Sequence, residues 1–275
     1  MRRKNKILPA KRVFITGASS GLGAALARQY ASEGAQLGLV ARRDSALREL
    51  IDSLPNAELH QHYPIDVNDH DSLAAAAAAF MQVAGGIDIV IANAGVSYGT
   101  LTERGADLPV FEKIIATNLL AMVATFAPFI SRMQAQAAAG QRDLRLVGIA
   151  SVAGIRGLPG AEAYSASKAA VISYCESLRI ELRRHGIRVV TIAPGYIDTP
   201  MTQVNTYSMP FLLPPHLFAT RAARVIAAGR SYAVIPWQMH GVAWLLRLLP
   251  NWLYDAVFAR APYKASMAEQ QTPPP

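Results

Sequence analysis

Short runs of β-branched and other apolar residues alternate with helical apolar spacing along most of this chain. The runs that read as strands are 13–16, 37–41, 58–66, 87–92, 144–151, 187–193 and 232–236. The helical stretches between them are 22–32, 45–54, 71–83, 111–138, 162–185 and 219–228. Strands that are apolar almost throughout, each followed by a helix, are typical of a parallel sheet covered on both faces. We therefore expect an α/β fold, a doubly wound parallel sheet of about seven strands in a single domain.

A glycine-rich turn follows the first strand-like run and opens the first helical stretch. In the sequence Thr-Gly-Ala-Ser-Ser-Gly-Leu-Gly, Gly17, Gly21 and Gly23 allow the backbone to turn sharply and approach a ligand closely. A pyrophosphate bound here would meet the N-terminus of the helix. The same letters fit the Gly-x-Ser-x-Gly turn of hydrolases, but that turn requires an already built sheet and a downstream acid and histidine. Dinucleotide binding is therefore the favoured interpretation.

The residues after the second strand-like run indicate which dinucleotide would bind. An acid at this place would accept hydrogen bonds from the ribose 2′-hydroxyl of NAD, whereas this chain has Ala41-Arg42-Arg43. A guanidinium can hold a 2′-phosphate through two hydrogen bonds, and a carboxylate would repel it. We expect NADP(H), with Arg42 as the principal contact. The alternative is that both arginines are solvated and simply begin a surface helix.

Tyr164 and Lys168 lie four residues apart in a helical stretch, so both side chains emerge from one face of the helix. Tyrosine ordinarily titrates near pH ~10, and a neighbouring cation lowers this pKa. The spacing alone is common, but here Ser151 ends an apolar strand-like run shortly upstream. Together the three residues indicate a site that moves a proton to or from a substrate oxygen.

These motifs resemble, in order and spacing, those of the single-domain short-chain dehydrogenases/reductases, from about residue 11 to residue 236. The matching elements are the glycine turn, Asp66-Val67, Asn93-Ala94-Gly95, Asn118, Ser151, Tyr164 with Lys168, and Pro194-Gly195. The resemblance implies a Rossmann-like fold and an NADP(H)-dependent interconversion of a carbonyl and a secondary alcohol. None of the catalytic positions departs from the family pattern.

The resemblance also implies a role for each site residue. Tyr164 would be the general acid or base, Lys168 would lower its pKa and hold the nicotinamide ribose, and Ser151 would polarise the carbonyl oxygen. Asn118 would hold a water linked to Lys168, although an asparagine in a buried helix can simply satisfy backbone groups. Asp66 would meet the adenine amine, and no metal is expected. The implied cofactor contacts are Gly17, Ser19, Ser20, Gly21, Leu22, Gly23, Arg42, Arg43, Asp66, Val67, Asn93, Ala94, Gly95, Tyr164, Lys168, Pro194, Gly195, Ile197 and Thr199.

The Pro-rich segment after Gly195 is expected to cover the substrate as a lid. Its apolar side chains are Met201, Tyr207, Met209, Phe211, Leu212 and Leu213. No lysine or arginine occurs between Arg188 and Arg221, so an apolar ketone, aldehyde or secondary alcohol is favoured. Arg104 and Arg156 lie in other loops and could approach the substrate, so the alternative of an anionic substrate stays open.

Composition and charge divide the chain further. We expect a basic disordered leader (1–10), a Rossmann-type dinucleotide-binding and catalytic domain (11–236), a Trp-rich helical extension (237–262) and a disordered tail (263–275). The net charge is +8, and six bases with no acid among them fall in the first twelve residues, where the apolar pair Ile7-Leu8 is too short for the apolar core of a signal peptide. Neither a signal peptide nor a nucleic-acid surface is therefore expected. The one cysteine, Cys175, excludes a disulfide framework and favours a reducing, cytoplasmic location.

The extension and two long helical stretches bear on assembly. All three tryptophans fall in 237–258, but Arg247 and Pro250 interrupt the run, so a membrane span is not expected. An oligomer contact or extra core cover is favoured over peripheral membrane contact. By the family resemblance, 111–138 and 162–185 would pair with their twins in a homodimer or homotetramer.

Two other classes of function stay open. A cofactor-binding sensor or scaffold without turnover would not need the intact Ser151, Tyr164 and Lys168. A lyase, isomerase or epimerase could use the same nucleotide site, but the modest chain length disfavours the larger sugar-modifying relatives. The sequence therefore predicts an oxidoreductase.

Overall fold

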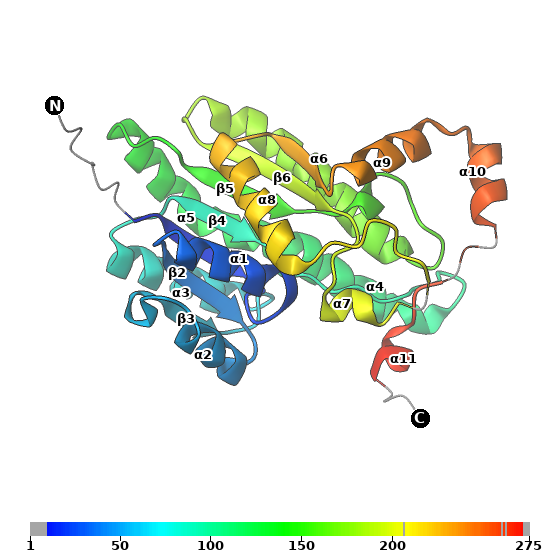
Figure 1. The fold of residues 1–275 in the computed structure, drawn as a ribbon, viewed down its shortest axis with the longest axis horizontal. Helices are drawn as coiled ribbons and strands as arrows, with labels where there is room; N and C mark the ends of the chain where they lie inside the picture. The colour runs from blue at the N-terminus through cyan, green and yellow to red at the C-terminus, as the bar shows by residue number, and fades with distance from the viewer. Residues whose placement is uncertain (1–9, 206, 260, 262, 272–275) are drawn as a thin grey trace.

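The computed structural model describes residues 10–205, 207–259, 261 and 263–271, and almost all of the predicted leader lies outside these ranges. Its seven strands form one parallel sheet in the order β3-β2-β1-β4-β5-β6-β7 (Figure 1). The strands are β1 (Arg12–Thr16), β2 (Gln36–Ala41), β3 (Gln61–Pro64), β4 (Ile89–Ala92), β5 (Arg145–Ile149), β6 (Arg188–Pro194) and β7 (Tyr232–Ile235). The prediction of a seven-stranded, doubly wound parallel sheet is confirmed.

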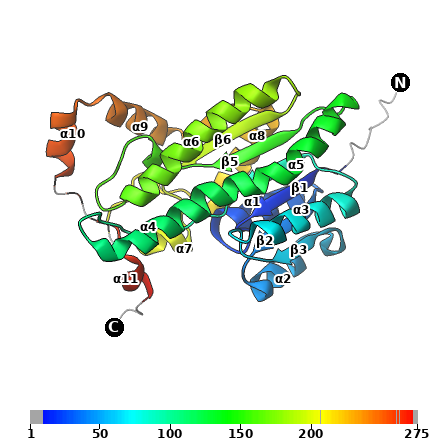
Figure 2. The same ribbon diagram turned by 180° about the vertical axis from the view of Figure 1, so that it is seen from behind.

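Helices cover both faces of this sheet. One face carries α1 (Gly21–Ser32), α2 (Asp44–Asp52) and α8 (Pro215–Ala228), and the other carries α3 (His70–Ala84), α4 (Leu108–Ile115), α5 (Ala121–Ala138) and α6 (Glu162–Arg183) (Figures 1 and 2). Each layer has its own apolar core, with Leu26 and Phe218 on the first face and Phe80 and Phe126 on the second. Both cores exclude water from the strands, which explains why the strand sequences are apolar throughout.

The predicted helix at 111–138 is divided in the structure. A π-helical turn, Ala116–Leu120, separates α4 from α5. The whole stretch Gly105–Ala138 is long and apolar enough to cross a membrane, but its side chains Phe126 and Phe129 are fully buried against the sheet. The packing is therefore that of a core helix.

Two other predicted ranges also differ from the observed ones. The run 58–66 divides into a short 3₁₀ turn, Ala57–Leu59, and β3, because the chain turns at Asn56 in a left-handed conformation. Helix α8 begins at Pro215 rather than near residue 219, and proline is well tolerated there because the first N–H of a helix has no intrahelical partner.

The amino ends of the central strands are held by polar contacts. The Arg12 guanidinium donates to both oxygens of Asp88 at 2.9 and 2.8 Å, joining the start of β1 to the residue before β4. From α5, the Gln136 amide donates to the Ile87 carbonyl at 2.7 Å and accepts from the Ile87 N–H at 3.0 Å. These bonds satisfy backbone groups at the amino ends of the strands. The opposite, carboxyl ends of the strands are left for a ligand.

The Trp-rich extension forms two helices, α9 (Gln238–Leu248) and α10 (Asn251–Phe258), beyond the end of the sheet (Figure 1). Arg156 holds them: its guanidinium donates to the Leu249 carbonyl at 2.7 Å and stacks 3.8 Å from the centre of the Tyr254 ring. The Tyr254 hydroxyl in turn donates to the Gly157 carbonyl. Arg156 therefore packs the extension against the rest of the protein and is not available to bind a substrate.

Residues 263–271 are ordered, in contrast to the predicted disordered tail (263–275), whose last four residues lie outside the described ranges. Residues 263–271 cross back over the body of the protein, pair with it through a bridge between Gly99 and Ser266, and end in α11 (Met267–Gln271). The Gly99 N–H donates to the Ala265 carbonyl at 2.8 Å. The backbone of this tail is ordered by hydrogen bonds to a distant loop, which composition alone does not reveal.

Candidate active site

A cavity of about 380 Å³ opens at the carboxyl ends of the central strands. The order of the strands reverses at β1 and β4, and in open α/β sheets ligands bind in the crevice at this reversal. Every predicted site residue lines the cavity except Gly23 and Asn118, both of which lie in direct contact with its wall. The structure thus brings together, at one place, motifs from the loops after six strands and from helix α6.

The glycine turn is held close to the loop that follows β4. The Asn93 side chain donates to the carbonyls of Thr16 and Gly17 at 3.0 and 3.2 Å. Gly17 has a positive φ of 69°, and a Cβ on Gly23 would lie 2.1 Å from the Gly17 carbonyl oxygen. Only glycine fits at Gly23, so the turn forms a backbone cradle at the start of α1 that suits a pyrophosphate.

The other end of the cavity has the features of an adenosine site. Arg42 and Arg43 are exposed at the end of β2, and the Arg43 guanidinium lies 3.5 Å from the Ser19 hydroxyl. Across from them, one oxygen of Asp66 accepts from the N–H and the amide of Asn68, both at 2.9 Å. These bonds orient the Asp66 carboxylate in the cavity wall.

Three polar side chains meet in the wall formed by β5 and α6. The Lys168 ammonium is buried and donates to the Ile149 carbonyl at 2.9 Å, and it lies 5.8 Å from the centre of the Tyr164 ring. Ser151, at the end of β5, accepts from the Ala153 N–H at 3.2 Å. Its hydroxyl hydrogen is therefore available for the Tyr164 oxygen or for a substrate.

The electrostatics of this group differ from the expectation that Lys168 lowers the Tyr164 pKa. Removal of water from the phenol raises the pKa of Tyr164 above its ordinary value, and a hydrogen bond from Ser151 opposes this rise. Burial disfavours the charged form of Lys168 too, and so lowers its pKa to about 8. Desolvation outweighs the attraction between the two groups because the ammonium is directed to the Ile149 carbonyl rather than to the phenol oxygen.

Asn118 lies in the π-helical turn and is completely buried. Its amide donates to the Val96 carbonyl and the Ser167 hydroxyl, both at 3.0 Å, and accepts from the Val96 N–H at 2.8 Å. The residue therefore joins the helix to the β4 loop and to α6, next to Lys168. Asn118 thus satisfies backbone groups, which is the alternative that the sequence left open. Its role in holding a water stays a prediction.

Sequence reasoning missed several residues of the cavity wall. Asn68 could have been found from its place two residues after Asp66, and Lys113 and Thr117 from their helical spacing to each other. Others contribute mainly backbone or apolar surface and carry no chemical signal. The missed residues are Ile65, Asn68, Val96, Lys113, Thr117, Ile149, Ala150, Pro200 and Thr202.

Known proteins resemble this chain in sequence and in fold. A family model described as short chain dehydrogenase matches residues 11–209. An uncharacterized oxidoreductase of Myxococcus xanthus is 36% identical over 90% of this chain and 96% of its own length.

Two solved structures are also similar. A 3-ketoacyl-(acyl-carrier-protein) reductase of Brucella melitensis complexed with NADH has 27% identity and a TM-score of 0.74, covering 82% of this chain and 94% of that one. A short chain dehydrogenase/reductase of Burkholderia phymatum in complex with NAD has 25% identity and a TM-score of 0.77, covering 93% and 97%. The chain therefore belongs to the short-chain dehydrogenase/reductase family of oxidoreductases, which use a nicotinamide cofactor.

Proposed function

We propose that this protein is an NADP(H)-dependent oxidoreductase that interconverts a carbonyl and a secondary alcohol. The observation that carries the proposal is the meeting of Ser151, Tyr164 and Lys168 in the wall of a cavity whose other end holds the glycine turn. A proton donor of this kind is needed where a carbonyl oxygen becomes a hydroxyl. A sensor or scaffold would have no use for it.

The choice of NADP(H) is supported by the charges at the end of β2. Arg42 and Arg43 both line the cavity, and among the described residues that line it Asp66 is the one acid. A 2′-phosphate beside Arg42 would gain charge-assisted hydrogen bonds. The two similar structures hold NADH and NAD, so this preference rests on the arginines of this chain.

The chain's own residues account for the proton. The cofactor, when bound, supplies or accepts a hydride. Tyr164 donates a proton to the carbonyl oxygen during reduction and removes it from the alcohol during oxidation. Ser151 donates a hydrogen bond that orients and polarises the same oxygen. Lys168, with a pKa of about 8, still carries its charge near neutral pH. A positive charge beside a phenol favours the phenolate, but in this site burial outweighs that effect on Tyr164.

We further propose a homo-oligomer in the cytoplasm, built on the outer surfaces of α5 and α6. Leu120 and Val123, beside and on α5, and Ile180, on α6, are exposed apolar side chains that a second copy could cover. Other apolar residues on these helices belong to the protein's own core, among them Phe126, Val171, Cys175, Leu178 and Leu182. The tryptophans of the extension are more than half exposed and offer an additional contact surface.

Replacing the catalytic pair should separate proton transfer from cofactor binding. Tyr164→Phe removes the transferable proton alone, so turnover should be lost while NADPH still binds with nearly wild-type affinity. Lys168→Ala should weaken both, because the ammonium serves the phenol and the cofactor ribose. Steady-state kinetics and fluorescence titration of NADPH measure the two effects. Full activity of Tyr164→Phe would rule out the mechanism.

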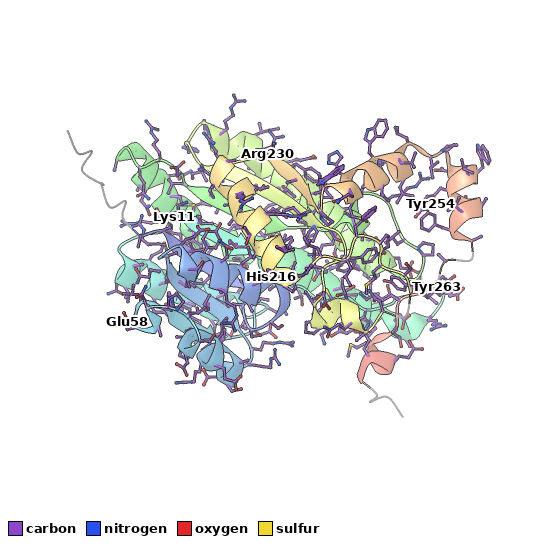
Figure 3. All side chains as sticks on the ribbon, viewed as in Figure 1. Lys11, Glu58, His216, Arg230, Tyr254 and Tyr263 are labelled. Carbon is purple, nitrogen blue, oxygen red and sulfur yellow. The ribbon has the colours of Figure 1, made fainter. Side chains whose placement is uncertain are left out.

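Cofactor preference should depend on Arg42. Arg42→Asp should weaken NADPH binding by roughly 1.5–3 kcal/mol, the range for a hydrogen bond to a charged group, and should affect NADH much less. Calorimetric titration of both cofactors measures this difference. Arg230→Asp is the matched control, because Arg230 is exposed and does not line the cavity (Figure 3). A wild-type protein that prefers NADH would contradict the assignment.

The pH profile of alcohol oxidation should report the Ser151 hydrogen bond. Oxidation needs the phenolate of Tyr164, and the bond from Ser151 lowers the pKa of that phenol. Ser151→Ala removes the bond, so the rising limb of kcat/KM should move to higher pH. Ser151→Thr keeps a hydroxyl and should move it less. An unchanged limb, or one displaced to lower pH in Ser151→Ala, would show that Ser151 does not act on the phenol.

A further inference from the structure

A second cavity, of about 330 Å³, lies beside Tyr164 and outside the proposed cofactor site. Four segments that are distant in the sequence form its walls: the loop after β4, the residues before α6, the chain after α7 (Pro200–Gln203) and the tail from residue 263. Tyr207 of the predicted lid lines it, whereas Phe211 and Leu212 are exposed and Leu213 is buried in the core. The lid thus covers only part of the substrate end, and the C-terminal tail supplies the rest.

The tail brings a second lysine to the catalytic tyrosine. The Lys264 ammonium lies 5.7 Å from the centre of the Tyr164 ring, compared with 5.8 Å for Lys168. Within the described part of the chain, it forms neither a hydrogen bond nor an ion pair. Burial lowers the pKa of Lys264 to about 8, so the group is still largely charged near neutral pH. An ammonium that is largely removed from water, with an aromatic ring beside it but no hydrogen-bonded or ionic partner in the described ranges, is costly, which is the condition expected of a ligand-binding cation.

The acids of this cavity are already engaged elsewhere. One Asp107 oxygen accepts from the Leu101 N–H at 2.9 Å, and one Glu269 oxygen accepts from the Ser266 N–H at 2.6 Å. Hydrogen bonds from Ser266 are the main cause that lowers the pKa of Glu269, and the positive charge of Arg104 adds to this effect. Neither acid forms an ion pair with Lys264 within the described ranges, so the ammonium is free to meet an anion from outside.

The position of Lys264 is set by two loops, at Gly99 and Gly160, that leave room for the tail. A Cβ on Gly99 would come within 2.1 Å of the Lys264 carbonyl oxygen, and one on Gly160 would lie 2.7 Å from the Cβ of Tyr263. Tyr263 marks this crossing in Figure 3. Contacts this close, with the backbone at Gly99 and with the base of a side chain at Gly160, require glycine at both places. The tail is therefore held in a defined position on the surface.

We propose that Lys264 binds a carboxylate of the substrate while the substrate's carbonyl or hydroxyl group lies at Tyr164. An ammonium and a carboxylate form a charge-assisted hydrogen bond, which is both strong and directional. The substrate class is then an oxo acid or the corresponding hydroxy acid. This inference rests on the proposed oxidoreductase function. It replaces the apolar substrate that the lack of cations in the lid favoured, and adds Lys264 to the two cations, Arg104 and Arg156, that left an anionic substrate open.

The test compares oxo acids with their uncharged esters. A series of methyl-ketone acids from pyruvate to 5-oxohexanoate, each with its methyl ester, is assayed by NADPH oxidation. We expect the wild type to prefer at least one acid to its ester. Lys264→Met should lower kcat/KM for that acid by about 10-fold or more, the loss expected of a hydrogen bond between charged groups, and should lower it much less for the ester. Lys264→Arg should retain the preference.

Two controls separate the charge from the fold of the tail. Lys11→Met removes an exposed lysine far from the cavity and should change neither substrate. Gly99→Ala should displace the tail and abolish the preference without touching the lysine. Gly105→Ala should leave both the tail and the preference unchanged, because a Cβ at this position meets no atom within 4 Å. Equal use of acid and ester by the wild type, or equal losses for both in Lys264→Met, would overturn the proposal.

Calorimetric titration of the same acids distinguishes failure of the binding site from failure of the proposed function. If no compound oxidises NADPH but an acid binds the wild type and not Lys264→Met, the carboxylate site stands and the oxidoreductase proposal is at fault. If the acids bind both proteins equally, or bind neither, the carboxylate site is wrong.

Discussion

Strands β1 and β4 lie side by side at the centre of the sheet, and the chain leaves them toward opposite faces. After β1 it continues into α1 on one face, and after β4 into α4 and α5 on the other. The two connections diverge, so a crevice opens between them at the carboxyl ends of the strands. The glycine turn lies on one side of this crevice and Asn93 ties it to the other. The remaining parts of the site are arranged around that opening.

Desolvation governs the chemistry at the bottom of the crevice. It raises the pKa of Tyr164 and lowers those of Lys168 and Lys264, so all three groups are biased toward their neutral forms before any ligand is present. An anionic ligand beside either ammonium would oppose this bias by favouring its charged form. A substrate carboxylate at Lys264 and the cofactor beside Lys168 would therefore keep both ammonium groups charged beside Tyr164 during proton transfer, in addition to holding the reactants.

Local patterns predicted most of the fold and the cofactor cavity. The glycine turn, the apolar strands and the spacing of Tyr164 and Lys168 are each set by a few consecutive residues, and all appear where the sequence indicates. The features that were missed depend on contacts between distant residues. The π-helical turn is held by Asn118 bonding to Val96. The ordered tail depends on room left by Gly99, and the Tyr164 pKa is set by packing that no local pattern contains.

The most direct test of this cofactor assignment is a crystal structure of the protein with NADP⁺. We expect the pyrophosphate at the turn between Gly17 and Gly23, the 2′-phosphate beside Arg42, and the nicotinamide next to Tyr164 and Lys168. The dinucleotide bound elsewhere, or bound with its nicotinamide directed toward Arg42, would contradict it.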